Sequence, residues 1–280
     1  ERKEMITIIT GKPGVGKTAL NTFFCWQTYR NDSARLLKLT CDRIELINES
    51  RVKPLPVPDA PPIYTNYEVK FLIGYEKYYE PYYVNPYYLG LTNDKLKMQN
   101  LPPYSRIFIS EAQRYYNSRK SSTLPDWVSR WYEMHRHYGI DVYLDVQRGK
   151  LIDLNIRELC KRFIEVQEME LDKAGGTWIA KTRWRCREFT GMQDFDDYIN
   201  GESANYAETS YEYDGNIFGC YNSTSCFNEF VPPEGEDFHY LPYHRRESAA
   251  ESTAVFYNTS EPELYRKPDK AAPKPSKEKK

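Results

Sequence analysis

The segment Met5–Thr28, M-I-T-I-I-T-G-K-P-G-V-G-K-T-A-L-N-T-F-F-C-W-Q-T, decides the fold. Its first six residues are mostly apolar, which is typical of a parallel strand covered on both faces. Gly11, Gly16, Lys17 and Thr18 match G-x-x-x-x-G-K-[ST], the pattern of a phosphate-binding loop between a strand and a helix. The glycines, Gly14 among them, let consecutive N–H groups turn inward around a phosphate at the positive end of the helix.

Each position of this loop has an expected role in nucleotide binding. Lys17 is expected to reach the β- and γ-phosphate oxygens as a point charge, and the Thr18 hydroxyl is expected to hold Mg²⁺. A chance glycine turn is the alternative, but the strand before it and the helix after it are the context that the motif requires. The predicted nucleotide-binding residues are Gly11, Lys12, Pro13, Gly14, Val15, Gly16, Lys17, Thr18 and Ala19.

Composition limits the remaining possibilities. The chain has 280 residues and a formal net charge of −1, so any nucleic-acid contact has to come from a local basic patch. Its six cysteines are scattered without a C-x-x-C pair, which favours reduced thiols over zinc ligands. No run of 18 apolar residues occurs, so no membrane span is expected within this sequence. The sequence begins at Glu1 and not at methionine, so a longer natural chain is expected.

The segment after the loop predicts a β-α-β unit. Residues 19–30 have helical spacing, Asn31-Asp32-Ser33 reads as a helix stop, and residues 35–40 read as a second strand. Parallel strands joined by a helix predict an α/β fold with a mostly parallel sheet flanked by helices. We expect an ATPase core over 1–200 with a surface insertion over 42–104, a closing segment over 201–231 and a flexible basic tail over 232–280.

The expected insertion is rich in proline and then in tyrosine. Residues 63–66 read as a short strand within it, and seven tyrosines follow between residues 75 and 88. These rings could form a stacking platform for single-stranded nucleic acid or an interface. Because Lys77 is the only cation among them, packing of the rings on the domain is favoured.

Residues 106–111, R-I-F-I-S-E, are the second informative stretch. An apolar strand that ends in a carboxylate beside the first strand is what a P-loop enzyme needs to position Mg²⁺ and the attacking water. Ser110 stands where an Asp is usual and could hold Mg²⁺ through a water. Glu111 is the candidate general base and a further Mg²⁺ ligand, the alternative being a surface Glu at a strand end.

Another strand and a polar residue follow a predicted helix. Residues 124–138 read as a helix that Gly139 ends, and residues 140–146 read as a strand. Gln147 then lies beyond the carboxyl end of that strand, where open α/β sheets place functional groups. It could sense the γ-phosphate or be an ordinary loop Gln, and the sequence leaves both open.

The last regular elements include a row of cations. Residues 153–159 read as a short helix, and residues 162–169 and 177–189 read as strands, with Lys181, Arg183, Arg185 and Arg187 on one face. Such a row could contact DNA phosphates or anionic lipid, or could be a charged edge that blocks sheet-to-sheet aggregation.

Taken together, these motifs resemble the zonular occludens toxin N-terminal domain family, which includes the gene I assembly ATPases of filamentous phages. The resemblance is carried by the P-loop, Y-T-N at 64–66, I-S-E-A-Q at 109–113, H-R-H-Y-G-I-D at 135–141, Gln147 and C-Y-N-S-T at 220–224. It covers about residues 5 to 226 and implies an additional-strand P-loop NTPase of the RecA/HerA-like class, with a C-terminal β-hairpin extension.

The resemblance implies an ATP- and Mg²⁺-dependent motor for virion assembly and DNA export at the host inner membrane. Lys17, Glu111 and Gln147 would be catalytic, in a homo-oligomeric ring, a hexamer, that a neighbour's arginine completes; Arg136 and Arg157 are the candidates. Implied partners are phage DNA or a DNA–protein complex and a membrane or secretion-channel protein, with the tail on anionic lipid or nucleic acid. The expected location is the host cytoplasm, peripheral to the inner membrane or anchored there through a region absent from this chain. A DNA-packaging ATPase and a nucleotide-binding scaffold with little hydrolysis are the alternatives.

Overall fold

The computed structural model describes residues 5–50, 54, 55, 57–86, 89, 101–119, 124–174, 178–223 and 225. The predicted tail over 232–280, and Tyr87 and Tyr88 of the tyrosine-rich segment, lie outside this range.

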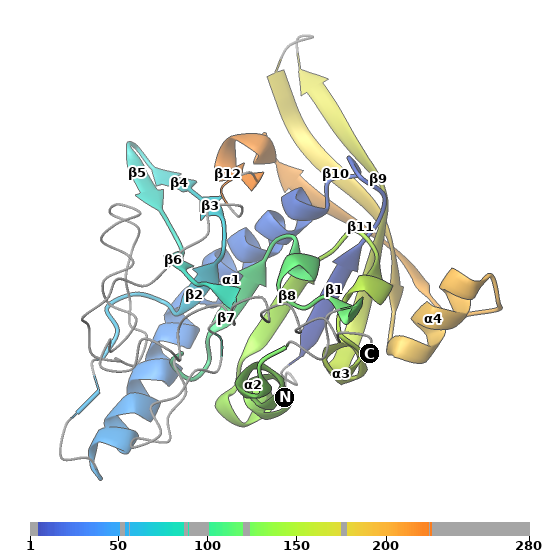
Figure 1. The fold of residues 1–280 in the computed structure, drawn as a ribbon. Coiled ribbons are helices and arrows are strands. Elements are labelled where there is room, and N and C mark those ends of the chain that lie inside the picture. Colours follow the sequence, from blue (N-terminus) through green and yellow to red (C-terminus); the bar gives the residue numbers. More distant parts are fainter. Residues whose placement is uncertain are drawn as a thin grey trace, which may run out of the picture.

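An eight-stranded sheet forms the centre of the protein, in the order β11-β10-β9-β1-β8-β7-β2-β6 (Figure 1). The six strands from β9 to β6 in this order run parallel, and β10 and β11 are antiparallel additions. The predicted mostly parallel α/β sheet and its β-hairpin extension are therefore confirmed. The strands are β1 (Ile6–Thr10), β2 (Ile63–Thr65), β6 (Tyr82–Tyr83), β7 (Arg106–Ile109), β8 (Asp141–Asp145), β9 (Cys160–Ala174), β10 (Trp178–Phe189) and β11 (Ala207–Asp214).

Strand β8 lies between β1 and β7 and pairs with both in parallel. The expectation that the strand ending at Glu111 lies directly beside the first strand is therefore wrong. Leu144 is opposite both Ile8 and Ile109, so the three strands end at nearly the same level. Since the carboxyl ends of parallel strands share one edge, the residues that follow β1, β7 and β8 lie together there.

The first helix is one continuous element, α1 (Lys17–Asn48). The predicted stop at residues 31–33 and the predicted strand over 35–40 are both wrong. Leu36, Thr40 and Ile44, four residues apart, are fully buried along one face of the helix. Asp32 pairs with Arg35 within the helix at 3.0 Å. Tertiary burial of this stripe outweighs the weak local preference of Asn, Asp and Ser for turns.

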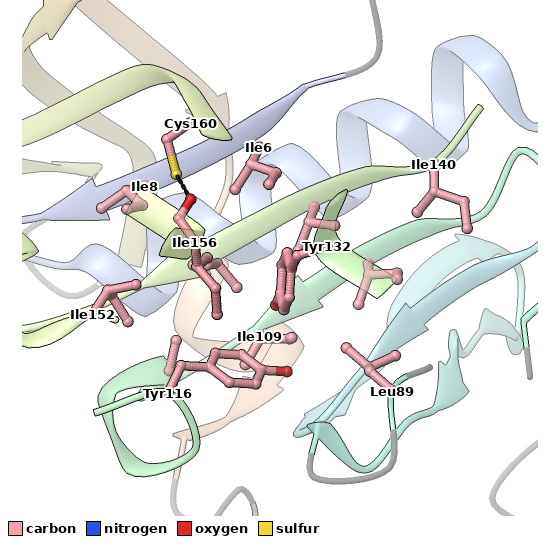
Figure 2. Packing of buried hydrophobic residues seen from close by; sticks show 14 of the residues in the cluster. Ile6, Ile8, Leu89, Ile109, Tyr116, Tyr132, Ile140, Ile152, Ile156 and Cys160 are labelled. Atoms are coloured by element: carbon pink, nitrogen blue, oxygen red, sulfur yellow. Dashed lines mark hydrogen bonds between the residues drawn. The ribbon is translucent and has the colours of Figure 1, made fainter. Parts of the chain in front are cut away.

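Helices cover both faces of the sheet. Helix α1 packs on one face with Ile9 and Tyr143, while α2 (Asp126–Met134), α3 (Leu154–Leu159) and α4 (Met192–Asn200) pack on the other. Figure 2 shows the second face, where Ile6 and Ile8 of β1 point towards Ile156 of α3. This alternation along β1 is the period of a strand covered on both sides. The predicted helices over 124–138 and 153–159 thus correspond to α2 and α3.

The segment 42–104, expected as a surface insertion, contributes β2 and β6 to the main sheet. It also forms two small antiparallel sheets, one with the closing segment. Tyr79, Tyr82 and Tyr83 are buried, whereas Tyr75 and Tyr78 are 91% and 53% exposed. The predicted packing of the tyrosine rings on the domain is therefore confirmed for Tyr79, Tyr82 and Tyr83. The small elements are β3 (Glu68–Val69) with β12 (Tyr221–Asn222), and β4 (Phe71–Gly74) with β5 (Lys77–Tyr79).

The cation row of β10 is not at a sheet edge, because β11 covers that strand. The interpretation as a protective edge is therefore wrong. Glu212 of β11 pairs with both Lys181 and Arg183, and Arg185 pairs with Glu168 of β9. Arg187 donates to the Tyr198 hydroxyl at 2.6 Å. Lys181, Arg183 and Arg185 thus have carboxylate partners on neighbouring strands, which weaken their attraction for phosphates, whereas Arg187 is bonded to a neutral hydroxyl. None of the helices within the described residues is long and apolar enough to cross a bilayer.

Candidate nucleotide-binding site

The phosphate-binding loop has the backbone geometry that its sequence predicts. Gly11, Gly14 and Gly16 all have positive φ, at 148°, 83° and 83°. A Cβ on Gly11 would lie 2.7 Å from the Val166 carbonyl oxygen, so the loop also packs too closely on β9 for a side chain. Gly16 precedes α1, and its carbonyl accepts a bond of 3.2 Å from the Trp184 indole of β10. The hairpin extension therefore holds the loop at the start of the helix.

Lys17 and Thr18 occupy the first turn of α1. The Lys17 ammonium is largely buried and donates to the Lys12 carbonyl at 2.9 Å, inside the loop. Burial lowers the pKa of Lys17, and the negative charges of Asp145 and Glu111 oppose that shift. The Thr18 hydroxyl lies 3.2 Å from the Ser110 hydroxyl. The two residues predicted for phosphate and Mg²⁺ are thus close to the ends of β7 and β8.

The end of β7 is held by Asn66, which follows β2. Its side chain makes two bonds to the main chain of Ser110: it accepts from the amide N–H at 2.7 Å and donates to the carbonyl at 3.0 Å. Glu111 follows in a left-handed conformation, φ 52°, which is strained for a residue with a Cβ. Gln113 Nε2 donates to the Glu111 carboxylate. These contacts fix the direction of Glu111 at the sheet edge.

The end of β8 brings a carboxylate that the sequence interpretation missed. Asp145 is fully buried, and its Oδ1 accepts bonds from the Glu111 N–H at 3.0 Å and from the Ser110 hydroxyl at 3.3 Å. Asn21 of α1 donates to its Oδ2 at 3.4 Å. Burial raises the pKa of Asp145 to about 6, although the hydrogen bond from the Glu111 N–H opposes the shift. Gln147 lies two residues further on, exposed at the same edge.

The two candidate arginines lie away from this edge or are already paired. Arg136 is exposed in a short turn, η4 (His135–Tyr138), which precedes β8 and so lies at the opposite end of that strand. Arg157 of α3 is largely buried, with Nη1 3.6 Å from Asp196 Oδ1. The structure brings neither of them to the P-loop of the same chain. A role for either would have to be in a neighbouring subunit.

The side chains around Thr18 suit a magnesium ion. The groups gathered there are the hydroxyls of Thr18 and Ser110 and the carboxylates of Asp145 and Glu111. All of these groups offer oxygen ligands, which Mg²⁺ prefers, and the phosphate oxygens of a nucleotide would complete the coordination. The Asn21 Oδ1 atom, also buried here, has no hydrogen-bond partner among the described residues. Within the described residues no group of three or more His, Cys, Asp and Glu suited to a metal ion occurs, so the site fits Mg²⁺ only together with hydroxyl and phosphate oxygens.

These features define the class of the protein. A P-loop joins β1 to α1, and the acidic residue Glu111 follows the end of β7. Strand β8 lies between β1 and β7 in the sheet. This is a P-loop NTPase fold of the additional-strand class.

A family model matches part of this chain in sequence. The model of the family described as zonular occludens toxin (Zot) matches residues 94–226. The resemblance to this family is thereby confirmed over that range, which contains Ser110, Glu111, Asp145 and Gln147 but not the P-loop. No curated protein matches the chain in sequence.

Solved structures show a distant likeness. The N-terminal domain of zonular occludens toxin from Neisseria meningitidis is 17% identical, with a TM-score of 0.42 over 79% of this chain and 100% of that one. The genome packaging NTPase of Sulfolobus turreted icosahedral virus 2, in complex with AMP, is 9% identical, with a TM-score of 0.37 over 74% and 98%. A KaiC-like protein from Pyrococcus horikoshii is 12% identical, with a TM-score of 0.31 over 77% and 87%. The assignment of the fold rests on this chain's own strand order and P-loop.

Proposed function

We propose that this protein hydrolyses ATP to drive filamentous-type virion assembly and DNA export at the host inner membrane. One observation carries the enzymatic part. The P-loop, Glu111 and Gln147 come from three separate stretches of sequence and lie at the carboxyl ends of adjacent strands, β1, β7 and β8. The match of residues 94–226 to the Zot family supports the assembly part.

The proposed chemistry is attack of water on the γ-phosphorus. Glu111 accepts the proton of the attacking water, the bond between the γ-phosphorus and the bridging oxygen breaks, and ADP and phosphate are released. Lys17 stabilises the charge on the β- and γ-oxygens, and Gln147 hydrogen-bonds the γ-phosphate or the water. Mg²⁺, held through Thr18 and Ser110, would supply positive charge against the phosphates.

A ring of subunits would complete the site. An arginine from a neighbour stabilises charge on the transferring phosphoryl group in many P-loop enzymes. Arg136 is the more accessible candidate, since Arg157 would first have to leave Asp196. The proposed ring is a hexamer that acts on phage DNA or a DNA–protein complex, in the host cytoplasm beside the inner membrane and its channel proteins. Native mass spectrometry with and without ATP would measure the subunit number.

The direct test is steady-state phosphate release by the wild type, Lys17→Ala and Glu111→Gln. We expect both variants to lose at least about 100-fold in turnover, Glu111→Gln because it removes the general base and Lys17→Ala because it removes a charge that stabilises the transition state. Glu111→Gln should still bind ATP, whereas Lys17→Ala should bind it weakly. Equal turnover in all three proteins would exclude the enzymatic proposal.

The alternatives give different results in the same assays. A packaging motor would be stimulated by duplex DNA ends, whereas an export motor would respond to single-stranded phage DNA or its coat complex. A nucleotide-binding scaffold would bind ATP tightly and release no phosphate. The substitution of Ser for Asp at position 110 is the observation that favours the scaffold.

A further inference from the structure

The replacement of a carboxylate by Ser110 leaves the proposed Mg²⁺ site short of one negative charge. The structure brings a different carboxylate to the same place. Ile109 and Leu144 are opposite each other in the ladder between β7 and β8, so Ser110 and Asp145 follow at matching positions. Asp145 is therefore the equivalent of the missing residue, one strand closer to the P-loop.

Polar contacts connect Asp145 to the helix that begins in the P-loop. Thr18 Oγ1 lies 3.2 Å from Ser110 Oγ, which in turn donates to Asp145 Oδ1 at 3.3 Å. On the other side, Asn21 bridges the Ile109 carbonyl, at 3.2 Å, and Asp145 Oδ2, at 3.4 Å. Thr18, the residue expected to bind Mg²⁺, and Asp145 are thus separated by a single hydroxyl group.

The charge of Asp145 has no direct partner. Its hydrogen bonds come from a backbone N–H, a hydroxyl and an amide, and among the described residues no Lys, Arg or His forms an ion pair with it. A buried carboxylate is costly unless a cation compensates it. The charge of Asp145 raises the pKa of Lys17 against the effect of burial, but the Lys17 ammonium donates to the Lys12 carbonyl. An asparagine could accept the two bonds made to Oδ1, but its amide nitrogen would face the Asn21 amide nitrogen donor to donor, so only a carboxylate accepts all three bonds.

We propose that Asp145 supplies the carboxylate of the Mg²⁺ site in place of residue 110, with Ser110 positioned between it and Thr18. In this role, the Asp145 carboxylate binds the Mg²⁺ ion either directly or through a water molecule. This inference rests on the proposed function, since it assumes that Mg²⁺ enters with a nucleotide.

The test measures metal binding, not turnover. In the full chain with Glu111 unchanged, which serves as the parent, binding of a fluorescent, non-hydrolysable ATP analogue is titrated with Mg²⁺ and repeated in EDTA, and Mn²⁺ binding is followed by EPR. We expect Asp145→Asn to weaken Mg²⁺ and Mn²⁺ at least about 10-fold, while nucleotide affinity in EDTA stays within about 2-fold, since the P-loop is intact.

Rescue from the neighbouring strand gives the sharper result. Adding Ser110→Asp to Asp145→Asn should return the metal affinity to within about 3-fold of the parent, whereas Ser110→Asp alone should change it much less. An effect of Ser110→Asp on metal affinity that depends on residue 145 is expected only if residues 110 and 145 bind the same ion. An unchanged metal affinity in Asp145→Asn, or equal effects of Ser110→Asp in both backgrounds, would overturn the proposal.

Two further variants distinguish loss of metal binding from loss of stability. Asp141→Asn removes a buried carboxylate at the other end of β8, so it should lower stability without changing metal affinity. If Asp145→Asn does not fold, Asp145→Glu keeps the charge but moves it by one methylene and should weaken Mg²⁺ at least about 3-fold; no change would also overturn the proposal. If the parent itself binds no nucleotide, the proposed function fails and the Asp145 inference fails with it. If the parent binds Mg²⁺ and nucleotide normally but the Asp145 variants match it, only the inference fails.

Discussion

A buried ion pair between β7 and β8 allows the scaffold to be perturbed without touching the site. Arg106 Nε lies 3.0 Å from Asp141 Oδ2, with both side chains less than a tenth exposed. Arg106 Nη1 also donates to the carbonyls of Tyr104, Ser105 and Gly139, and Asp141 Oδ1 accepts from the Met5 N–H at 2.9 Å. The pair therefore joins the amino-terminal ends of β1, β7 and β8.

Replacement of Arg106 by Met should destabilise the protein strongly. It leaves Asp141 buried without its cation and removes a donor from three carbonyls. Loss of one member of a buried ion pair typically costs about 3–5 kcal/mol. For a chain of this size, where about 1 kcal/mol shifts Tm by about 2–4 °C, Tm should fall by about 6–20 °C.

Urea unfolding followed by circular dichroism measures this loss, with Lys38→Met as the control. Lys38 forms an exposed pair with Asp42 within α1, and such pairs often contribute nothing measurable. Nucleotide affinity of folded Arg106→Met should stay within about 2-fold of the wild type, because Arg106 is at the end of β7 remote from Glu111. A loss of less than about 1 kcal/mol, or one no greater than that of the control, would show that the ion pair does not hold the strands together.

Three further predictions concern the P-loop, the end of β7 and β10. Gly14 and Gly16 share a φ of 83°, but a Cβ on Gly16 would lie 2.3 Å from a side chain of β9 and one on Gly14 meets nothing within 4 Å. In urea unfolding, Gly16→Ala should thus cost more than Gly14→Ala because the Met169 side chain has to move, and equal losses would contradict the close packing. Asn66→Ala leaves the buried N–H and carbonyl of Ser110 without their side-chain partner. It should therefore lower the free energy of unfolding by about 2–4 kcal/mol and lower ATP turnover. Unchanged stability and turnover would show that the two Asn66–Ser110 hydrogen bonds are dispensable. Because Arg185 is already paired with glutamates, Arg185→Gln should leave the salt dependence of DNA binding unchanged, and a slope reduced by about 1 would identify it as a phosphate contact.

Local patterns predicted the elements around the site. An apolar strand, a glycine loop and a helix start occur within Met5–Thr28, and their geometry depends on neighbouring residues only. Strands β7 and β8 were predicted because their apolar runs are bounded by polar residues. The strand predicted over 35–40 was wrong because Asn31-Asp32-Ser33 reads locally as a stop, whereas burial of Leu36, Thr40 and Ile44 depends on packing against distant segments.

In the site, too, the residues of local motifs were predicted, whereas a residue whose partners are distant in the sequence was missed. Lys17, Thr18 and Glu111 were predicted from motifs, and the structure brings them to one edge of the sheet. Asp145 was missed because its partners, Ser110 and the Glu111 N–H, are on another strand. A signal was nevertheless present: a carboxylate directly after three apolar residues of a strand, two residues before Gln147. A buried charge at such a position indicates a cation or a hydrogen-bond network nearby.

The position of β8 between β1 and β7 limits how an ATP-driven cycle can proceed. A strand hydrogen-bonded along both sides cannot slide lengthwise without breaking both ladders at once, and β8 is paired on both sides from Val142 to Leu144. The ladders consequently hold Asp145 at a fixed position relative to Ile9, near the end of β1, and Ser110, which directly follows β7. The central strands of the sheet would then stay in place during the cycle. In the proposed motor, movement would be transmitted by the segments that follow these strands, beginning with Gln147 and the loop after Glu111.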